Sequence, residues 1–203
     1  MLEAAVRSEL GLEQLGSDAQ KSLGIQNLSG NVTISGVLLS DQNSYPGIDL
    51  VSMDNEDIFG ERLLTADKSL LTQLDQAMEF FRRYYCRDMV TGSLERKKVY
   101  LVPEQAFRES IVNALVHRQW DISADILLKM YPDRMQVNSP GGLPYGITKE
   151  DYLYRDISVP RNFTITNLFL RLGLIEKLGT GIHRIIRSYS KTWRRSYYCL
   201  YSN

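Results

Sequence analysis

The chain contains few of the residues that build metal, redox or disulfide-stabilised sites. Its 203 residues include two cysteines, Cys86 and Cys199, and two histidines, His117 and His183. Two cysteines so far apart in the sequence form neither a metal-ligand motif nor a disulfide framework. This composition favours a protein of the reducing cytoplasm.

Long hydrophobic runs are also missing. The longest apolar stretch, ITNLFLRLGLI, is interrupted by Asn167 and Arg171 and is too short to span a bilayer. The first residues, MLEAAVRSEL, lack the basic region followed by an apolar stretch that marks a signal peptide. We therefore expect a soluble intracellular protein with no membrane partner.

Neither sign of charge is in excess, and two catalytic motifs are absent. Lys and Arg together number 24, as do Asp and Glu, so the net charge gives no argument for or against a nucleic-acid partner. The absence of G-x-x-x-x-G-K-[ST] excludes a P-loop nucleotide site. The absence of G-x-S-x-G disfavours a Ser-His-Asp hydrolase.

Local patterns predict helices that alternate with strand pairs. Six apolar residues recur at helical spacing over 69–85: Leu70, Leu71, Leu74, Met78, Phe81 and Tyr85. Pro103 is well placed to open a second helix over 103–118. Further helices are expected at 148–154, around 163–175 and from Gly181, and strands at 47–54, 87–92, 97–102, 122–131 and 134–139. Residues 54–61 are expected to form an acidic loop, and residues 31–40 fit either a strand or a short helix.

These elements predict an α+β fold. We expect a two-layer α/β sandwich in which helices cover one face of a mixed, mostly antiparallel sheet. A hydrophobic content of 43% over 203 residues suits one good-sized core with a small appendage. We expect residues 1–45 to form an N-terminal helical and extended segment that packs on a main domain over residues 46–203. A domain of this type usually closes with another strand pair, so its C-terminus is expected to be truncated.

The helix expected over residues 103–118 carries a polar stripe opposite its apolar one. At about 100° per residue, four apolar residues share one side: Phe107, Ile111, Ala114 and Leu115. Glu109, Asn113 and His117 fall on the other side. This places a proton acceptor one turn from an amide that can hold a cation, which suits a nucleotide–Mg²⁺ site. A solvated polar face is the alternative, and His117 either lines the same pocket or makes a structural hydrogen bond.

Two glycine-rich loops follow this helix. Asn138 to Pro144, NSPGGLP, comes directly after a strand, and its paired Gly141 and Gly142 would let backbone approach a ligand closely. Gly179, Thr180 and Gly181 precede a helix, whose unpaired N–H groups can bind a phosphate. An ordinary connecting loop and a tight turn capped by Thr180 are the respective alternatives, because a lone G-x-G is weak evidence.

The order of helix, strand, glycine loop, helix and second glycine loop resembles the GHKL superfamily of ATPases. The phrases FRESIVNALVHRQW, VNSPGGLPYGIT, SVPRNFTITNLF and LGLIEKLGTGIHRI are similar to the GHKL-like module at the C-terminal end of transcriptional regulators and RecG-helicase-related proteins. The resemblance covers about residues 103–190 and is looser upstream. It implies the GHKL, or Bergerat-type, version of the sandwich described above.

The resemblance also implies roles for single residues. Glu109 matches the general base that activates the attacking water, and Asn113 matches the Mg²⁺-binding Asn that tethers the triphosphate. Gly141 and Gly142 match the first glycine box, beside the adenine. Gly179 and Gly181, with Thr180 between them, match the second box, which closes over the phosphates of ATP or ADP.

The sequence departs from this family in its first glycine box. The box usually begins with an Asp whose carboxylate accepts a hydrogen bond from the adenine amino group, whereas Asn138 and Ser139 stand here. The amide oxygen of Asn138 can accept the same bond, but loss of an ionised acceptor costs on the order of 1–3 kcal/mol of binding. Arg161 and Asn162, between the two boxes, either contact phosphates or cap the following helix.

We therefore interpret the chain as an ATP/Mg²⁺-binding GHKL-like module of a DNA-binding transcriptional regulator, with weak or absent ATP hydrolysis. DNA would be bound by a domain outside this chain, and a homodimer is expected. One alternative is a degenerate GHKL fold that serves as a dimerisation or protein-interaction scaffold without ligand. Another is direct nucleic-acid binding by a stretch rich in Arg and aromatic residues over 183–198, which includes Arg184, Arg194 and Arg195.

Overall fold

The computed structural model describes residues 2–55, 57–90, 96–100, 102–155, 159–175 and 181–190. The helices in this part of the chain are α1 (Leu2–Leu10), α2 (Ser17–Ser22), α3 (Ile34–Leu38), α4 (Leu70–Tyr85), α5 (Glu104–His117), α6 (Lys149–Tyr154), α7 (Phe163–Arg171) and α8 (Gly181–Ser190). The strands are β1 (Ile48–Met53), β2 (Phe59–Leu64), β3 (Cys86–Val90), β4 (Arg96–Tyr100), β5 (Ile126–Met130) and β6 (Met135–Asn138). None of these helices is both long enough and apolar enough to cross a membrane.

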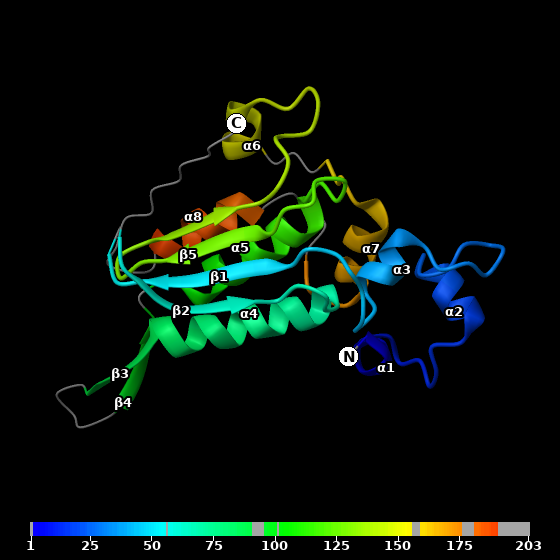
Figure 1. Ribbon diagram of the computed structural model, residues 1–203, viewed down its shortest axis with the longest axis horizontal. Helices are drawn as coiled ribbons and strands as arrows, with labels where there is room; N and C mark the ends of the chain where they lie inside the picture. The colour runs from blue at the N-terminus through cyan, green and yellow to red at the C-terminus, as the bar shows by residue number, and fades with distance from the viewer. Residues whose placement is uncertain are drawn as a thin grey trace.

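A four-stranded mixed sheet forms one layer of the fold (Figure 1). Its strand order is β2-β1-β5-β6. β1 pairs with β2 and β5 with β6 in antiparallel fashion, and β1 runs parallel to β5. The connection between the two parallel strands contains α4, α5 and the β3–β4 hairpin, which projects from the end of α4 (Figure 1).

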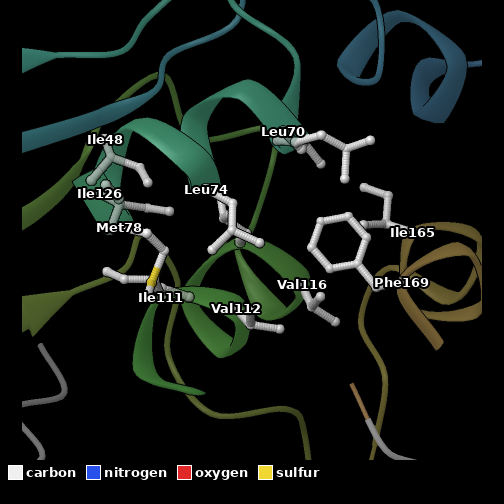
Figure 2. Close-up of a cluster of buried hydrophobic side chains, with 14 of the residues drawn as sticks. Ile48, Leu70, Leu74, Met78, Ile111, Val112, Val116, Ile126, Ile165 and Phe169 are labelled. Atoms are coloured by element: carbon white, nitrogen blue, oxygen red, sulfur yellow. The ribbon is translucent and has the colours of Figure 1, made fainter. Parts of the chain in front are cut away.

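Helices α4, α5 and α8 form the other layer. α5 lies in the middle, because it packs against α4 on one side and α8 on the other. The main hydrophobic core lies between this layer and the sheet. It joins Ile48 and Ile126 from the strands to Leu74 of α4, Ile111 of α5 and Phe169 of α7 (Figure 2). The α+β fold class, a mixed sheet with helices packed on it, is therefore confirmed.

The amphipathic patterns of α4 and α5 explain why these helices hold the centre of the fold. Ser69 caps α4 by accepting a hydrogen bond from the backbone N–H of Thr72, as short polar residues do at helix starts. Phe81 of α4 and Phe107 of α5 stack with their ring centroids 4.3 Å apart, and both are fully buried. The two helices are therefore held side by side by aromatic packing.

Residues 54–61 were expected to form a loop, but β2 begins at Phe59, so the prediction was wrong for residues 59–61. β2 is an edge strand whose side chains are mostly exposed, and it therefore lacks the apolar alternation that marks a half-buried strand. Side-chain contacts with β1 and α4 hold β2 in place instead. Arg62 makes two 2.8 Å hydrogen bonds to the Asp49 carboxylate on β1, and Glu61 bonds Arg83 and Tyr84 of α4. The ambiguous stretch 31–40 contains the short helix α3, capped by Thr33.

Candidate functional site

The polar stripe of α5 does not face solvent. The side chain of Glu109 is 10% exposed, while Asn113 and His117 are half-buried. The stripe points away from the sheet-facing core and toward α8, which packs along α5, and α6 packs on α8. A solvated polar face, one of the two readings of this pattern, is therefore excluded for Glu109.

Gly181, the first residue of α8, lies directly against the pair. A Cβ atom built on Gly181 would stand 2.4 Å from Oε1 of Glu109 and 2.9 Å from Nδ2 of Asn113. Real Cβ atoms do not approach other atoms so closely, so any residue but glycine would displace one of these side chains. The structure thus brings together three predicted site residues from segments about 70 residues apart.

Two further residues lie near Glu109. Nη1 of Arg184, one turn after Gly181 on α8, is 3.7 Å from Oε2 of Glu109, and the Arg184 side chain is 19% exposed. Tyr152 of α6 is close enough that the charge of Glu109, after the larger effect of burial, raises the pKa of its phenol. From the sequence, Arg184 was interpreted as part of the basic–aromatic stretch over 183–198, and Tyr152 was not singled out. Arg184 could have been recognised from its i, i+3 spacing from Gly181, which places both residues on one face of the helix.

The first glycine loop packs on the C-terminal end of α5. Ser139 donates a 3.0 Å hydrogen bond to the carbonyl of Ala114. Gly141 has a φ of +101°, and a Cβ there would stand 2.5 Å from the Arg161 guanidinium. Arg161 reaches past it to donate to the carbonyls of His117 and Gly142, at 3.1 and 2.8 Å. The glycine at position 141 therefore makes room for Arg161.

Asn162 has a different role from the two expected for it. It occupies the N-cap position of α7, but its side chain makes no capping bond there. Its Nδ2 instead donates to the carbonyls of Val116 and Arg118, each at 2.8 Å. These are among the carbonyls that the end of α5 leaves without intrahelical partners. Asn162 thus caps the C-terminal end of α5 rather than the start of α7.

Asn138 is not part of this cluster. It pairs with Leu127 across the β5–β6 ladder, and directly opposite residues of an antiparallel pair share one face of the sheet. Leu127 lines a shallow pocket of about 380 Å³ on the sheet face away from α5, together with Asp49, Val51 and Arg62. The exposed Asn138 is therefore on the far face, and its neighbour Ser139 is the one directed at α5.

Some predicted residues lie outside the described part of the chain. Gly179 and Thr180 of the second glycine loop are among them, as are Arg194 and Arg195 of the basic–aromatic stretch. Within that stretch, Arg184 is paired with Glu109 and Arg187 is exposed on α8.

The oxygens of Glu109 and Asn113 have the chemistry that magnesium prefers. Mg²⁺ is usually held by one or two protein oxygens together with substrate phosphates. Among the described residues, no three His, Cys, Asp or Glu side chains gather as a metal site. One carboxylate and one amide could hold such an ion only together with further oxygens, such as those of phosphates, and Gly181 lies in close contact with both side chains.

His117, at the end of the polar stripe, should make the stability of the protein depend on pH. Burial, and then the positive charge of Arg161, lower the pKa of its imidazole below the ordinary 6.5. The unfolded chain therefore takes up this proton at a higher pH than the folded chain does. The free energy of unfolding should fall as the pH is lowered below about 6.5. Urea unfolding between pH 7.5 and 5.0 should show this fall in the wild type and a weaker one in His117→Gln; equal slopes would contradict it.

A family of known proteins matches part of the chain. Residues 123–196 match the model of a family described as "Putative ATP-dependent DNA helicase recG C-terminal". This range contains the first glycine loop and α8 but not Glu109 or Asn113. No curated protein matches the chain.

A solved structure resembles almost the whole chain. The DIP2311 protein from Corynebacterium diphtheriae superposes with a TM-score of 0.81 at 26% sequence identity. The match covers 96% of this chain and 40% of that protein, so the chain spans about two fifths of its relative's length. The fold described above, including its N-terminal helices, is therefore shared with a larger protein. Residues 123–196 are thus similar to a RecG-related C-terminal domain family, in agreement with the GHKL-like resemblance of the motifs in that range.

Proposed function

We propose that the chain binds a nucleotide, ATP or ADP with Mg²⁺, in the seam between α5 and α8. The observation that carries the proposal is the buried carboxylate of Glu109, which lies one helical turn from Asn113. Both side chains lie against Gly181, and only glycine fits at position 181 without displacing them. A protein that needed only to pack two helices would place apolar side chains at these positions, because burying a carboxylate is costly. Perturbed polar groups gathered on one seam are typical of functional sites.

Each side chain has a role in this proposal. Asn113 would offer its amide oxygen to the magnesium ion, which supplies charge neutralisation for the phosphates when bound. Glu109 would orient a water molecule and accept its proton. The start of α8, with Gly181 at its first position, would direct backbone N–H groups at the phosphates.

Hydrolysis is proposed to be weak. Asn138 lies on the far face of the sheet, and no carboxylate takes the place of the family's adenine-binding Asp in the first glycine box. The Glu109 carboxylate also lies 3.7 Å from the Arg184 guanidinium, so this contact competes with the orientation of a water molecule by Glu109.

A thermal-shift titration tests nucleotide binding. ATP or ADP with Mg²⁺ at ten times its dissociation constant should stabilise the protein by about 1.4 kcal/mol, which raises the Tm by about 3–6 °C for a chain of this size. Asn113→Ala should weaken binding about tenfold, because it removes an oxygen bonded to a charged group. Gln105→Ala, an exposed change on the same helix, should leave the titration unchanged.

A ligand-free scaffold is the second candidate. It is favoured by the closed seam, in which Gly181 already contacts both polar side chains and Arg184 neutralises Glu109. If millimolar ATP and ADP leave the Tm unchanged, this candidate replaces the first. Sedimentation analysis would then show whether the fold serves as a homodimer interface.

We propose further that the whole protein is a DNA-associated transcriptional regulator. The family description concerns a DNA helicase, and the chain spans only part of its structural relative. We propose that DNA is bound by a domain outside this chain, which spans about two fifths of its structural relative. A salt-sensitive gel shift given by this chain alone, and lost on reversing Arg194 and Arg195, would instead support direct binding.

A further inference from the structure

A cavity of about 520 Å³ lies where the N-terminal segment meets α7. It is lined by residues between 10 and 23, from the end of α1 to the end of α2, and by Arg171, the last residue of α7. These three helices lie together at one end of the molecule (Figure 1). We call this cavity the N-terminal pocket. None of its lining residues belongs to α5 or α8, so the proposed nucleotide site does not account for it.

Most of the pocket wall is apolar. Leu10, Leu12, Ala19 and Leu23 line it. Leu23 is 6% exposed and belongs to the main hydrophobic core, while Leu10 and Leu12 are half-buried and pack against that core. Small-molecule sites have volumes of about 300–1,000 Å³ and are lined mainly by apolar side chains with a few polar groups among them. The size and the wall of the pocket therefore favour a small ligand with an apolar body.

The polar part of the wall consists of one guanidinium, one carboxylate and one hydroxyl group. They belong to Arg171, Asp18 and Ser22. Neither Arg171 nor Asp18 forms an ion pair with any residue in the described part of the chain. Nη1 of Arg171 lies 3.5 Å from Oγ of Ser22, which is longer than the usual N–H···O distance of about 2.7–3.2 Å. Both charges can therefore pair with groups of a ligand.

Contacts between the N-terminal segment and α7 hold the walls of the pocket in place. Gly24, directly after Leu23, has a φ of +71°, and a Cβ atom there would stand 2.5 Å from Cγ2 of Thr164 on α7. The backbone that follows α2 thus packs closely on α7. Nε2 of Gln20 also donates a 2.9 Å hydrogen bond to the carbonyl of Leu15, which ties α2 to the loop before it. A pocket that is formed before its ligand arrives loses less conformational entropy on binding.

The two charges narrow the class of ligand. A polyanion such as a nucleotide would bring like charge to the Asp18 carboxylate, and an amine without an acidic group would bring like charge to Arg171. A guanidinium binds a carboxylate through two parallel hydrogen bonds, and a carboxylate accepts hydrogen bonds from an ammonium group. A zwitterion with an aliphatic body therefore matches both the charges and the apolar wall.

We propose that the N-terminal pocket binds an aliphatic zwitterion, either an apolar α-amino acid or a short apolar peptide. Arg171 pairs with the carboxylate of the ligand and Asp18 with its ammonium group. The leucine side chains of the wall cover its aliphatic groups. This site is separate from the seam between α5 and α8, and its occupation does not depend on nucleotide binding.

An NMR titration of the ¹⁵N-labelled chain with leucine and with leucyl-leucine tests the proposal. The backbone amide signals of residues 10–12, 18–23 and 171 should shift with at least one of them, and the tighter ligand shows whether the amino acid or the peptide is preferred. Glycylglycine lacks the aliphatic groups and octanoate lacks the ammonium group, so each should bind at least about tenfold more weakly. The proposal is overturned if neither zwitterion shifts these signals at millimolar concentration.

Two variants test the roles of the charges. Arg171→Gln should weaken binding of the tighter zwitterion at least about tenfold, because a hydrogen bond between charged groups is lost. The amide of the same ligand has no carboxylate, so it should bind the wild type and Arg171→Gln within about twofold of each other. Asp18→Asn should weaken the zwitterion but not its N-acetyl derivative. Arg82→Gln, an exposed change in the last turn of α4, is the matched control and should leave the titration unchanged.

The variants also distinguish the proposal from other kinds of binding. If Arg171→Gln and Asp18→Asn both keep the wild-type affinity, apolar contacts alone hold the ligand and the proposal is wrong. If octanoate binds as tightly as the zwitterion and Asp18→Asn changes neither affinity, the pocket takes a simple carboxylate and the proposal is overturned. Both substituted side chains are exposed, so the variants should fold, and thermal melts verify that they do.

Discussion

Replacement of Arg118 by methionine is expected to lower the free energy of unfolding by about 2–4 kcal/mol. Arg118 is fully buried, and its guanidinium donates to the carbonyls of Pro46, Gly47, Ile122 and Ala124. Gly47 and Ile122 keep a backbone donor, from Ile126 and Ala124 respectively. Methionine fills similar space but leaves the carbonyls of Pro46 and Ala124 without the donor that Arg118 supplies, and loss of a hydrogen bond from a charged group costs about 1.5–3 kcal/mol.

An opposing effect limits the size of this loss. Burial lowers the pKa of the Arg118 guanidinium, which means that folding pays to bring this charge out of water. Methionine removes that cost, and replacing buried charges by apolar residues is neutral in some proteins. Urea unfolding decides between the two effects. Arg171→Met, at an exposed position on α7, should change stability by less than about 0.5 kcal/mol; an equally small change for Arg118→Met would contradict the prediction.

The sequence predicted those parts of the fold that are determined by local periodicity. α4 and α5 carry apolar stripes that show which side each helix buries, and both helices lie within a residue of their expected bounds. β2 was missed because an edge strand shows no such pattern. Its support comes from side chains that meet it from β1 and α4, such as Asp49 and Tyr84, and no window of consecutive residues contains them.

The same distinction applies to the candidate site. Helical geometry placed Glu109, Asn113 and His117 on one side of α5, as the structure has them. It could not show that this side is covered, because the covering helix begins about 70 residues later. Nor could it show that Arg161 and Asn162 bind the carbonyls at the end of α5. Such contacts depend on the path of the chain between the elements.

Replacement of Gly181 by alanine is expected to weaken nucleotide binding about a hundredfold while leaving the fold intact. The new Cβ would stand 2.4 Å from Oε1 of Glu109 and 2.9 Å from Nδ2 of Asn113, so both side chains must leave the positions in which they would meet the ligand. Loss of two charge-assisted contacts corresponds to about 3 kcal/mol, or a factor of about a hundred. Calorimetric titration with ADP and Mg²⁺ measures this loss.

Stability should respond much less than binding. The two displaced atoms are the ends of flexible side chains, and alanine is favoured over glycine in helices by up to about 1 kcal/mol, so the Tm should change by only a few degrees. Gly16→Ala is the matched control, because a Cβ there meets no atom within 4 Å and the position is remote from α5. Undiminished ADP binding by Gly181→Ala would mean that the ligand binds elsewhere. A nucleotide that contacts Glu109 and Asn113 in their present positions would bind more weakly once the added methyl group displaces them.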